Sequence, residues 1–268
     1  MSQSFSDAEV LESALDWWRL AGVDWVEPLK PPPPKPSPRP AAGASTQKVR
    51  RNDPTEPPPF AAEAVSPTRA VARAADSLEA LEAGVAGLKL GRLTDAARNP
   101  VFARGVPGAA LMVIGEAPGA EEDAVGRPFV GRSGQLLDRM LAAIGLGPED
   151  VYISNILNWR PPGNRTPETA EIAQCLPLIE RHIALAAPKV LLLTGGVAAQ
   201  TLLRTTTGIM RLRGRFHDYA LRDPEGAETG ETLPALAFLH PAFVLRQPKA
   251  KALCWRDFLG LEARLKAL

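Results

Sequence analysis

"AALMVIGEAPG", residues 109–119, joins an apolar run of strand length to a loop broken by glycine and proline. Similar apolar runs follow along the chain, at 151–155, 189–194 and 233–239. Stretches with helical periodicity lie between or after them, at 132–145, 167–187, 196–204 and about 248–267. Near-continuous apolar strands that alternate with helices indicate a parallel sheet covered on both faces. The sequence therefore predicts an α/β fold.

Composition limits the class of protein. The 268 residues are 45% hydrophobic, which suffices for one core of ordinary size. Because the net charge is only +1, any nucleic-acid surface has to be a local basic patch. Two cysteines, Cys175 and Cys254, are too few for a disulfide scaffold and suit a reducing compartment. The sequence has no basic-then-apolar leader and no apolar run of membrane length, so we expect a soluble, cytoplasmic protein.

The amino-terminal part of the chain has a different composition. Residues 6–21, inside a segment 1–27, have the periodicity of a short amphipathic helix. Residues 28–60 hold 12 of the 27 prolines and predict an extended, flexible linker. We assign residues 61–268 to the folded domain, which starts with an Ala-rich helical stretch at 61–85. The helix either packs back on this domain or docks a partner.

Polar or glycine residues follow each predicted strand. The four strands run into Gly115-Glu116, Ser154-Asn155, Thr194-Gly195-Gly196 and His240-Pro241. In open α/β sheets, ligands bind beyond the carboxyl ends of the strands. The sequence therefore predicts a site at this edge of the sheet.

Glu116 is the first candidate at this edge. A carboxylate that directly follows a buried strand is partly desolvated, and it can orient or deprotonate a water molecule. An ordinary turn residue is the alternative. The loop that follows, with Ala117, Pro118 and Gly119, can turn its backbone N–H groups inward. Three further acids, at 121–123, exceed what a solvated turn needs and favour a site built around an attacking water.

Asn155 and Phe129 are candidates for recognising a base. The Asn155 amide offers one donor and one acceptor, which match the O4 and N3–H edge of uracil; an Asx turn is the alternative. Phe129 in RPFVG is suited to stacking on a base, and core packing is its alternative.

The segment HPAFVLRQP, residues 240–248, predicts a catalytic imidazole beside a DNA-contacting loop. A neutral His240 can donate a hydrogen bond to an oxygen that gains negative charge. Pro241 disfavours a helical conformation at the residue before it. Phe243 and Leu245 offer an apolar wedge beside Arg246, as base flipping requires.

Three stretches resemble the family 4 uracil-DNA glycosylases of bacteria and archaea. They are GEAPGAEEDAVGRPFVGRSGQLLDRMLAAIGL (115–146), VYISNILNWRPPGNRTP (151–167) and HPAFVLRQP (240–248), and the resemblance runs from about residue 80 to the C-terminus. It implies an α/β/α sandwich around a central four-stranded parallel sheet. It also implies hydrolysis of the N-glycosidic bond of deoxyuridine in DNA, which leaves an abasic site for base excision repair.

The resemblance also assigns roles to residues of this chain. Glu116 resembles the family's water-positioning acid, Phe129 the residue that stacks on uracil, Asn155 the residue that hydrogen-bonds the base, and His240 the stabiliser of the departing uracil anion. Thymine has to be excluded by steric conflict at its C5 methyl group, and Phe129 and the Glu116 loop are the candidates for this. We expect the protein to bind uracil-containing DNA and to be a monomer. A partner of the amino-terminal helix would then be a repair or replication protein.

The chain departs from the family at its cluster ligands. Most family 4 enzymes hold a [4Fe–4S] cluster through four cysteines, and here Leu88, Gly91 and Trp159 occupy three of these positions. Cys175 remains, and one thiolate cannot hold such a cluster. We therefore expect no metal and no cofactor. The segment beside this region supplies Arg160 and Arg165 as candidate phosphate contacts.

Three alternatives stay open. The first is a glycosylase for other deaminated bases such as hypoxanthine. The second is a non-catalytic DNA-binding or scaffold protein. The third is a covalent uracil-DNA binder of the same superfamily, which traps the sugar on a histidine. The corresponding loop here, RPPGNRTP (160–167), has no histidine, which disfavours the third.

Overall fold

The computed structural model describes residues 66–268. The predicted helix at 6–21, the linker at 28–60 and the start of the assigned domain at 61–65 lie outside the described residues.

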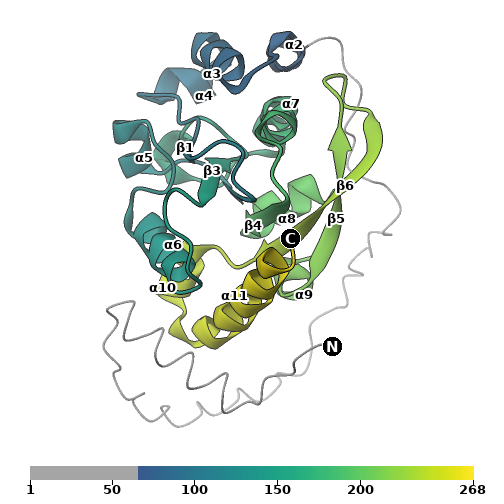
Figure 1. The fold of residues 1–268 in the computed structure, drawn as a ribbon. Helices are drawn as coiled ribbons and strands as arrows, with labels where there is room; N and C mark the ends of the chain where they lie inside the picture. Colours follow the sequence, from purple (N-terminus) through teal and green to yellow (C-terminus); the bar gives the residue numbers. More distant parts are fainter. Residues whose placement is uncertain (1–65) are drawn as a thin grey trace, which may run out of the picture.

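A mixed sheet forms the centre of the described chain, with six strands in the order β1-β3-β2-β4-β6-β5 (Figure 1). The strands are β1 (Arg104–Gly105), β2 (Leu111–Gly115), β3 (Val151–Asn155), β4 (Val190–Thr194), β5 (Phe216–Arg222) and β6 (Glu228–Phe238). The four middle strands are parallel, and β1 and β5 add to the edges in antiparallel orientation. The predicted parallel sheet is confirmed, with an antiparallel strand added at each edge.

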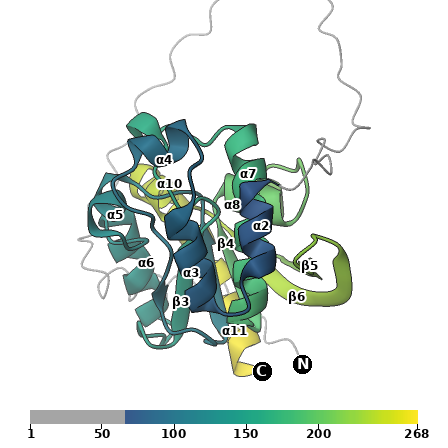
Figure 2. The same cartoon turned by 90° about the horizontal axis from the view of Figure 1, so that it is seen from above.

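Helices cover both faces of this sheet, so the three-layer α/β/α arrangement is confirmed. Figures 1 and 2 show α2, α3 and α7 on one face and α6 and α11 on the other. The helices are α2 (Pro67–Ala74), α3 (Leu78–Gly87), α4 (Arg92–Ala96), α5 (Ala120–Val125), α6 (Arg132–Ala142), α7 (Thr169–Ala186), α8 (Gly196–Leu202), α9 (Ile209–Leu212), α10 (Pro241–Arg246) and α11 (Lys251–Lys266), with short 3-10 turns at Pro162–Asn164 and Pro248–Ala250. None of the helices between residues 66 and 268 is both long enough and apolar enough to cross a bilayer.

The strand side chains alternate between two apolar clusters. On β2, Met112 and Ile114 join the cluster under α7, while Leu111 and Val113 join the cluster under α6 and α11. All five residues of β2 are buried. Burial on both faces explains why the parallel strands appear in the sequence as uninterrupted apolar runs.

Several element boundaries differ from those predicted. The described part of the helical stretch 61–85 forms two helices, α2 and α3, and the Ser77 hydroxyl accepts a hydrogen bond from the Ala80 N–H (3.1 Å) and caps α3. The segment 240–248, predicted as a loop, contains helix α10. The strand predicted at 233–239 is the second half of β6, which ends at Phe238, begins with a polar first half and pairs with β5 along both halves.

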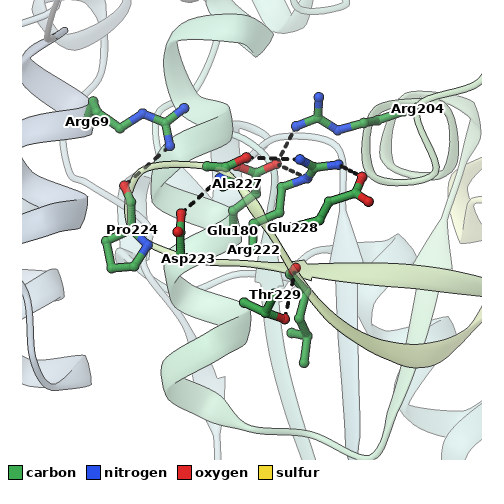
Figure 3. Close-up of polar contacts among 11 residues, drawn as sticks. Arg69, Glu180, Arg204, Arg222, Asp223, Pro224, Ala227, Glu228 and Thr229 are labelled. Carbon is green, nitrogen blue, oxygen red and sulfur yellow. Dashed lines mark hydrogen bonds and ion pairs between the residues drawn. The ribbon is translucent and has the colours of Figure 1, made fainter.

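A buried ion cluster fixes the β5–β6 hairpin against α7. Figure 3 shows Arg204 and Arg222 directed at the Glu180 carboxylate, at 2.9 and 3.5 Å. Burial raises the pKa of Glu180, and the neighbouring arginines act in the opposite direction. Arg69 on α2 donates to the Pro224 carbonyl at the hairpin turn (3.4 Å). These contacts join the β5–β6 hairpin to α2 and α7, the helices on the face opposite α6 and α11.

Candidate active site

Loops after the parallel strands meet at one edge of the sheet, as predicted. The Ile156 N–H donates to the Gly115 carbonyl (3.0 Å), which joins the ends of β3 and β2. The Gly195 N–H donates to the Phe238 carbonyl (2.8 Å), which joins the ends of β4 and β6. A Cβ atom at Gly195 would lie 3.3 Å from the Cβ of His240, so the β4 loop and His240 are in close contact.

Two predicted site residues crowd around Gly115, and a third faces one of them. A Cβ atom at this position would lie 2.3 Å from Oδ1 of Asn155 and 2.6 Å from Cζ of Phe129. Such approaches are far below contact distance, so only glycine fits at the end of β2. The Phe129 ring also faces the His240 ring, with centroids 5.9 Å apart and an interplanar angle of 27°. Sequence-distant side chains thus gather around one glycine.

Phe129 is held in an unusual backbone conformation. Its φ is +54°, in the left-handed region that aromatic residues rarely occupy. A Cβ at Gly134 would lie 1.8 Å from the Phe129 carbonyl oxygen, so the next helix also needs a glycine to accept this loop. The ring belongs to the buried cluster under α6 and α11. Phe129 therefore packs in the core and also borders the site, which combines the two interpretations considered for it.

Glu116 stands at the predicted edge with its carboxyl half-buried. Its carbonyl oxygen accepts from the Leu157 N–H (3.1 Å), which continues the β2–β3 pairing beyond the strands. Burial raises the pKa of the carboxyl above its usual range. A carboxylate with raised pKa is more basic than a free one, as a general base near neutral pH requires. In the same loop, Ala117 and Gly119 are half-buried and Pro118 is buried.

The three acids after this loop do not act together on a water molecule, which corrects the interpretation of the 121–123 run. The side chain of Glu121 is exposed. The carboxylate of Glu122 accepts backbone N–H groups from Gly119 and from residues 130 and 131. The carboxylate of Asp123 accepts the backbone N–H groups of Arg98 (2.7 Å) and Asn99 (3.3 Å). Glu122 and Asp123 thus hold neighbouring loops in place through backbone hydrogen bonds. The capping-box position of Glu122, third in α5, is the only sequence signal of this role.

His240 is the N-cap of α10, in an extended conformation with φ −62° and ψ 133°. The Ala242 N–H donates to its Nδ1 (3.1 Å), so a neutral ring carries its proton on Nε2. Burial, with a smaller contribution from Arg246, lowers the pKa of His240 to about 4, while Glu122 opposes the shift. His240 is therefore neutral at pH 7 and carries an Nε2–H group that can donate a hydrogen bond.

Helix α10 directs its predicted DNA-contacting residues outward. Phe243 and Leu245 are large apolar side chains exposed to solvent, at 36% and 41%, and Arg246 is exposed in the last turn. Val244 between them is fully buried and anchors the helix in the core. The residues predicted to form a wedge thus lie on a short helix that Val244 anchors in the core, rather than on a loop.

The two candidate phosphate contacts of the 160–167 segment have partners within the chain. Arg160 donates from Nε to Oδ1 of Asn164 (2.6 Å) and lies 3.7 Å from the Asp123 carboxylate. Arg165 makes a bidentate pair with Glu171, at 2.8 and 2.6 Å. Both guanidinium groups stay partly exposed. Phosphate binding by Arg165 would have to compete with its carboxylate partner.

Comparison with known proteins adds independent information. The model of the uracil DNA glycosylase superfamily matches residues 102–259. A type-4 uracil-DNA glycosylase of Sulfurisphaera tokodaii is 34% identical over 188 residues, covering 68% of this chain and 82% of the relative. The type-4 enzyme of Archaeoglobus fulgidus is 38% identical, covering 56% and 74%, and that of Thermotoga maritima is 36% identical, covering 55% and 72%.

These relatives correct the cofactor prediction. We expected no metal and no cofactor, but type-4 uracil-DNA glycosylases are characteristically iron–sulfur proteins, so that prediction is wrong.

The donor set at the family's ligand positions nevertheless does not fit a four-thiolate cluster. Leu88, Trp159 and Cys175 lie in one apolar cluster, and burial raises the pKa of the Cys175 thiol to about 12. Among residues 66–268, no group of three or more His, Cys, Asp or Glu side chains is arranged to hold a metal ion. Three of the four ligand positions thus carry residues without a thiolate: Leu88, Gly91 and Trp159.

The family model spans more than half of the sequence, and the chain covers most of the length of the Sulfurisphaera enzyme. The parallel sheet and the loops at its carboxyl edge agree with this assignment. The chain belongs to the uracil DNA glycosylase superfamily.

Proposed function

We propose that this chain is a uracil-DNA glycosylase, a hydrolase that flips deoxyuridine out of DNA, cleaves its N-glycosidic bond and leaves an abasic site. The observation that carries the proposal is the contact of Asn155 and Phe129 at Gly115, with the His240 ring facing the ring of Phe129 and with Glu116 next to Gly115 in the chain. The names of the relatives, type-4 uracil-DNA glycosylases, point to the same reaction.

His240 assists departure of the base. When the glycosidic bond breaks, the sugar becomes oxocarbenium-like and negative charge spreads over O2, N1 and O4 of uracil. A neutral imidazole that donates from Nε2 stabilises this anion, and the Ala242 N–H at Nδ1 keeps the ring in the required tautomer. Because the pKa of His240 is about 4, the ring is neutral at neutral pH and acts as a hydrogen-bond donor rather than as a proton donor.

Asn155 and Phe129 recognise the base, and Glu116 supplies the water. The Asn155 amide hydrogen-bonds the uracil edge while the Phe129 ring stacks on its face. The basic carboxylate of Glu116 positions a water molecule that captures the sugar cation. Gly115, Ala117, Pro118 and Gly119 line the same pocket.

The DNA approaches over α10. Phe243 and Leu245 fill the gap left by the flipped base, and Arg246 meets a phosphate, with Arg160 and Arg165 as further phosphate contacts. We further propose that the protein acts as a monomer in the cytoplasm. Cys175 and Cys254, both buried free thiols, are compatible with that reducing compartment. A partner for the amino-terminal segment remains part of the proposal.

The test is excision from a labelled oligonucleotide with one uracil, followed by alkaline cleavage. We expect Glu116→Gln, Asn155→Ala and His240→Ala each to lower the single-turnover rate by about 10²–10⁴-fold, the usual range for a lost acid–base or electrostatic contribution. Glu121→Gln removes an exposed carboxylate from the first turn of α5, directly after the Glu116 loop, and is the matched control, for which we expect the wild-type rate. Wild-type rates in all three site variants would refute the assignment of the site.

A further inference from the structure

Glu122 connects two loops that are far apart in sequence. Its Oε2 accepts the Gly119 N–H at 3.1 Å, and its Oε1 accepts the N–H groups of Val130 and Gly131 at 3.0 and 2.9 Å. The residue is buried, with 8% of its surface exposed. One carboxylate therefore satisfies three backbone donors and fixes the spacing between the two loops.

These two loops are the walls of the proposed base pocket. The first ends at Gly119 and carries Glu116. The second starts at Phe129, whose ring touches the Gly115 position. Both walls are the candidates for excluding the C5 methyl group of thymine.

The second wall needs an external restraint. Phe129 has a φ of +54°, and strained backbone of this kind persists only where the surroundings over-determine it. Glu122 binds the two N–H groups that directly follow this residue, and the carbonyl oxygen of Phe129 lies against Gly134 on the other side. The strained residue is thus held from both sides.

We propose that Glu122 is a positioning residue that sets the width of the base pocket and thereby the discrimination between uracil and thymine. The inference rests on the proposed glycosylase function. Uracil and thymine differ by one methyl group. To exclude thymine, the two loops that form the walls of the pocket have to keep their spacing to within the size of a methyl group. Glu122 supplies that constraint without touching the base itself.

The first test is Glu122→Gln, which keeps the size of the side chain. An amide has only one acceptor oxygen, so it cannot accept the N–H groups of both loops. We expect the ratio of uracil to thymine excision, measured at single turnover in identical duplexes, to fall by roughly 10–200-fold, the range that one methyl group confers in a fitted pocket. The ratio of uracil to 5-fluorouracil excision should change less, because fluorine is smaller than a methyl group.

A second variant displaces the same carboxylate without removing it. A Cβ at Gly119 would lie 2.7 Å from Oε2 of Glu122, and the backbone there does not require glycine. Gly119→Ala should therefore push the carboxylate away and lower the same ratio. This variant keeps the proposal testable even where Glu122→Gln does not fold.

Matched controls separate pocket width from stability. Asp123→Asn alters the neighbouring buried carboxylate, which accepts N–H groups from residues 98 and 99 rather than from the pocket walls. Gly87→Ala adds a methyl group where no atom lies within 4 Å. Both variants should keep the wild-type ratio, whatever their thermal stability.

Two outcomes overturn different claims. If the wild-type protein excises uracil but uracil and thymine rates fall in parallel in Glu122→Gln and Gly119→Ala, Glu122 has only a structural role and the proposal is wrong. If the folded wild-type protein does not excise uracil, the proposed function fails first.

Discussion

Gly115→Ala tests the geometry of the site with one added methyl group. The new Cβ would lie 2.3 Å from Oδ1 of Asn155 and 2.6 Å from Cζ of Phe129. Ordinary contact distances are about 3.5 Å or more, so each of the two side chains has to move by roughly 1 Å. The substitution therefore displaces the amide and the ring together, without changing either residue.

The expected size of the effect follows from these overlaps. Overpacking of a buried site costs about 1–3 kcal/mol of unfolding free energy. For a domain of this size that lowers Tm by about 2–12 °C. A misplacement of about 1 Å in a catalytic constellation costs on the order of 10²-fold in rate, so the loss of activity should exceed what partial unfolding explains.

The assay combines thermal unfolding with single-turnover excision of uracil at a temperature where the variant is folded. Gly196→Ala is the matched control, because it lies at the same edge of the sheet and a Cβ there meets no atom closer than 3.9 Å. We expect that control to keep both Tm and rate. A Gly115→Ala protein with wild-type rate and Tm would refute the described packing around Gly115.

Three further predictions follow from the site and the core. Burial raises the pKa of Glu116 and lowers that of His240 to about 4, so excision needs Glu116 ionised and the imidazole neutral. In a pH–rate profile, the wild-type rate should fall on the acid side as Glu116 is protonated, and the residual activity of Glu116→Gln should persist to lower pH and fall near pH 4; the same acid limb in both proteins would contradict this. Leu245→Ala removes an exposed side chain and should leave the unfolding free energy within about 0.5 kcal/mol of wild type, while slowing excision from duplex more than from single-stranded DNA; equal slowing on both substrates would argue against a wedge. Trp159→Ala empties a site that is 4% exposed and should cost about 3–5 kcal/mol in a denaturant titration, and a cost under 1 kcal/mol would mean that this ring does not pack as described.

The parallel part of the sheet could be predicted because its strands are buried on both faces. Each of β2, β3 and β4 is buried along its whole length, which leaves an apolar run that the sequence displays directly. Strand β5, FHDYALR, has mixed exposure and sits at an edge, and the first half of β6, ETGET, is exposed. Neither segment carries an apolar period, so the hairpin has no sequence signal and depends on the ion cluster around Glu180.

Helix α10 was not predicted because Pro241 suggested a loop. Proline is favourable in the first turn of a helix, where its missing N–H is not needed, and His240 before it acts as the N-cap. The same proline therefore explains both the correct expectation for His240 and the wrong one for the residues after it.

Some residues of the candidate site could be predicted from the sequence, and others could not. Glu116, Asn155 and His240 could be singled out because each lies at or just after a strand end, and parallel strands bring these ends to one edge. Glu122 could not, because its capping-box position predicts a helix cap and gives no sign of a contact with residues 130 and 131. Only its partners at residues 130 and 131, supplied by the folded loops, distinguish it from Glu121.

The most direct measurement of the central claim is the product balance of the wild-type protein on a duplex with one uracil. Free uracil would be quantified by mass spectrometry, and strand integrity would be examined before and after alkali. The account predicts one free uracil for each abasic site, with the strand intact until alkali is added. Folded protein that releases no uracil, or that releases a different base from a matched duplex, would contradict it.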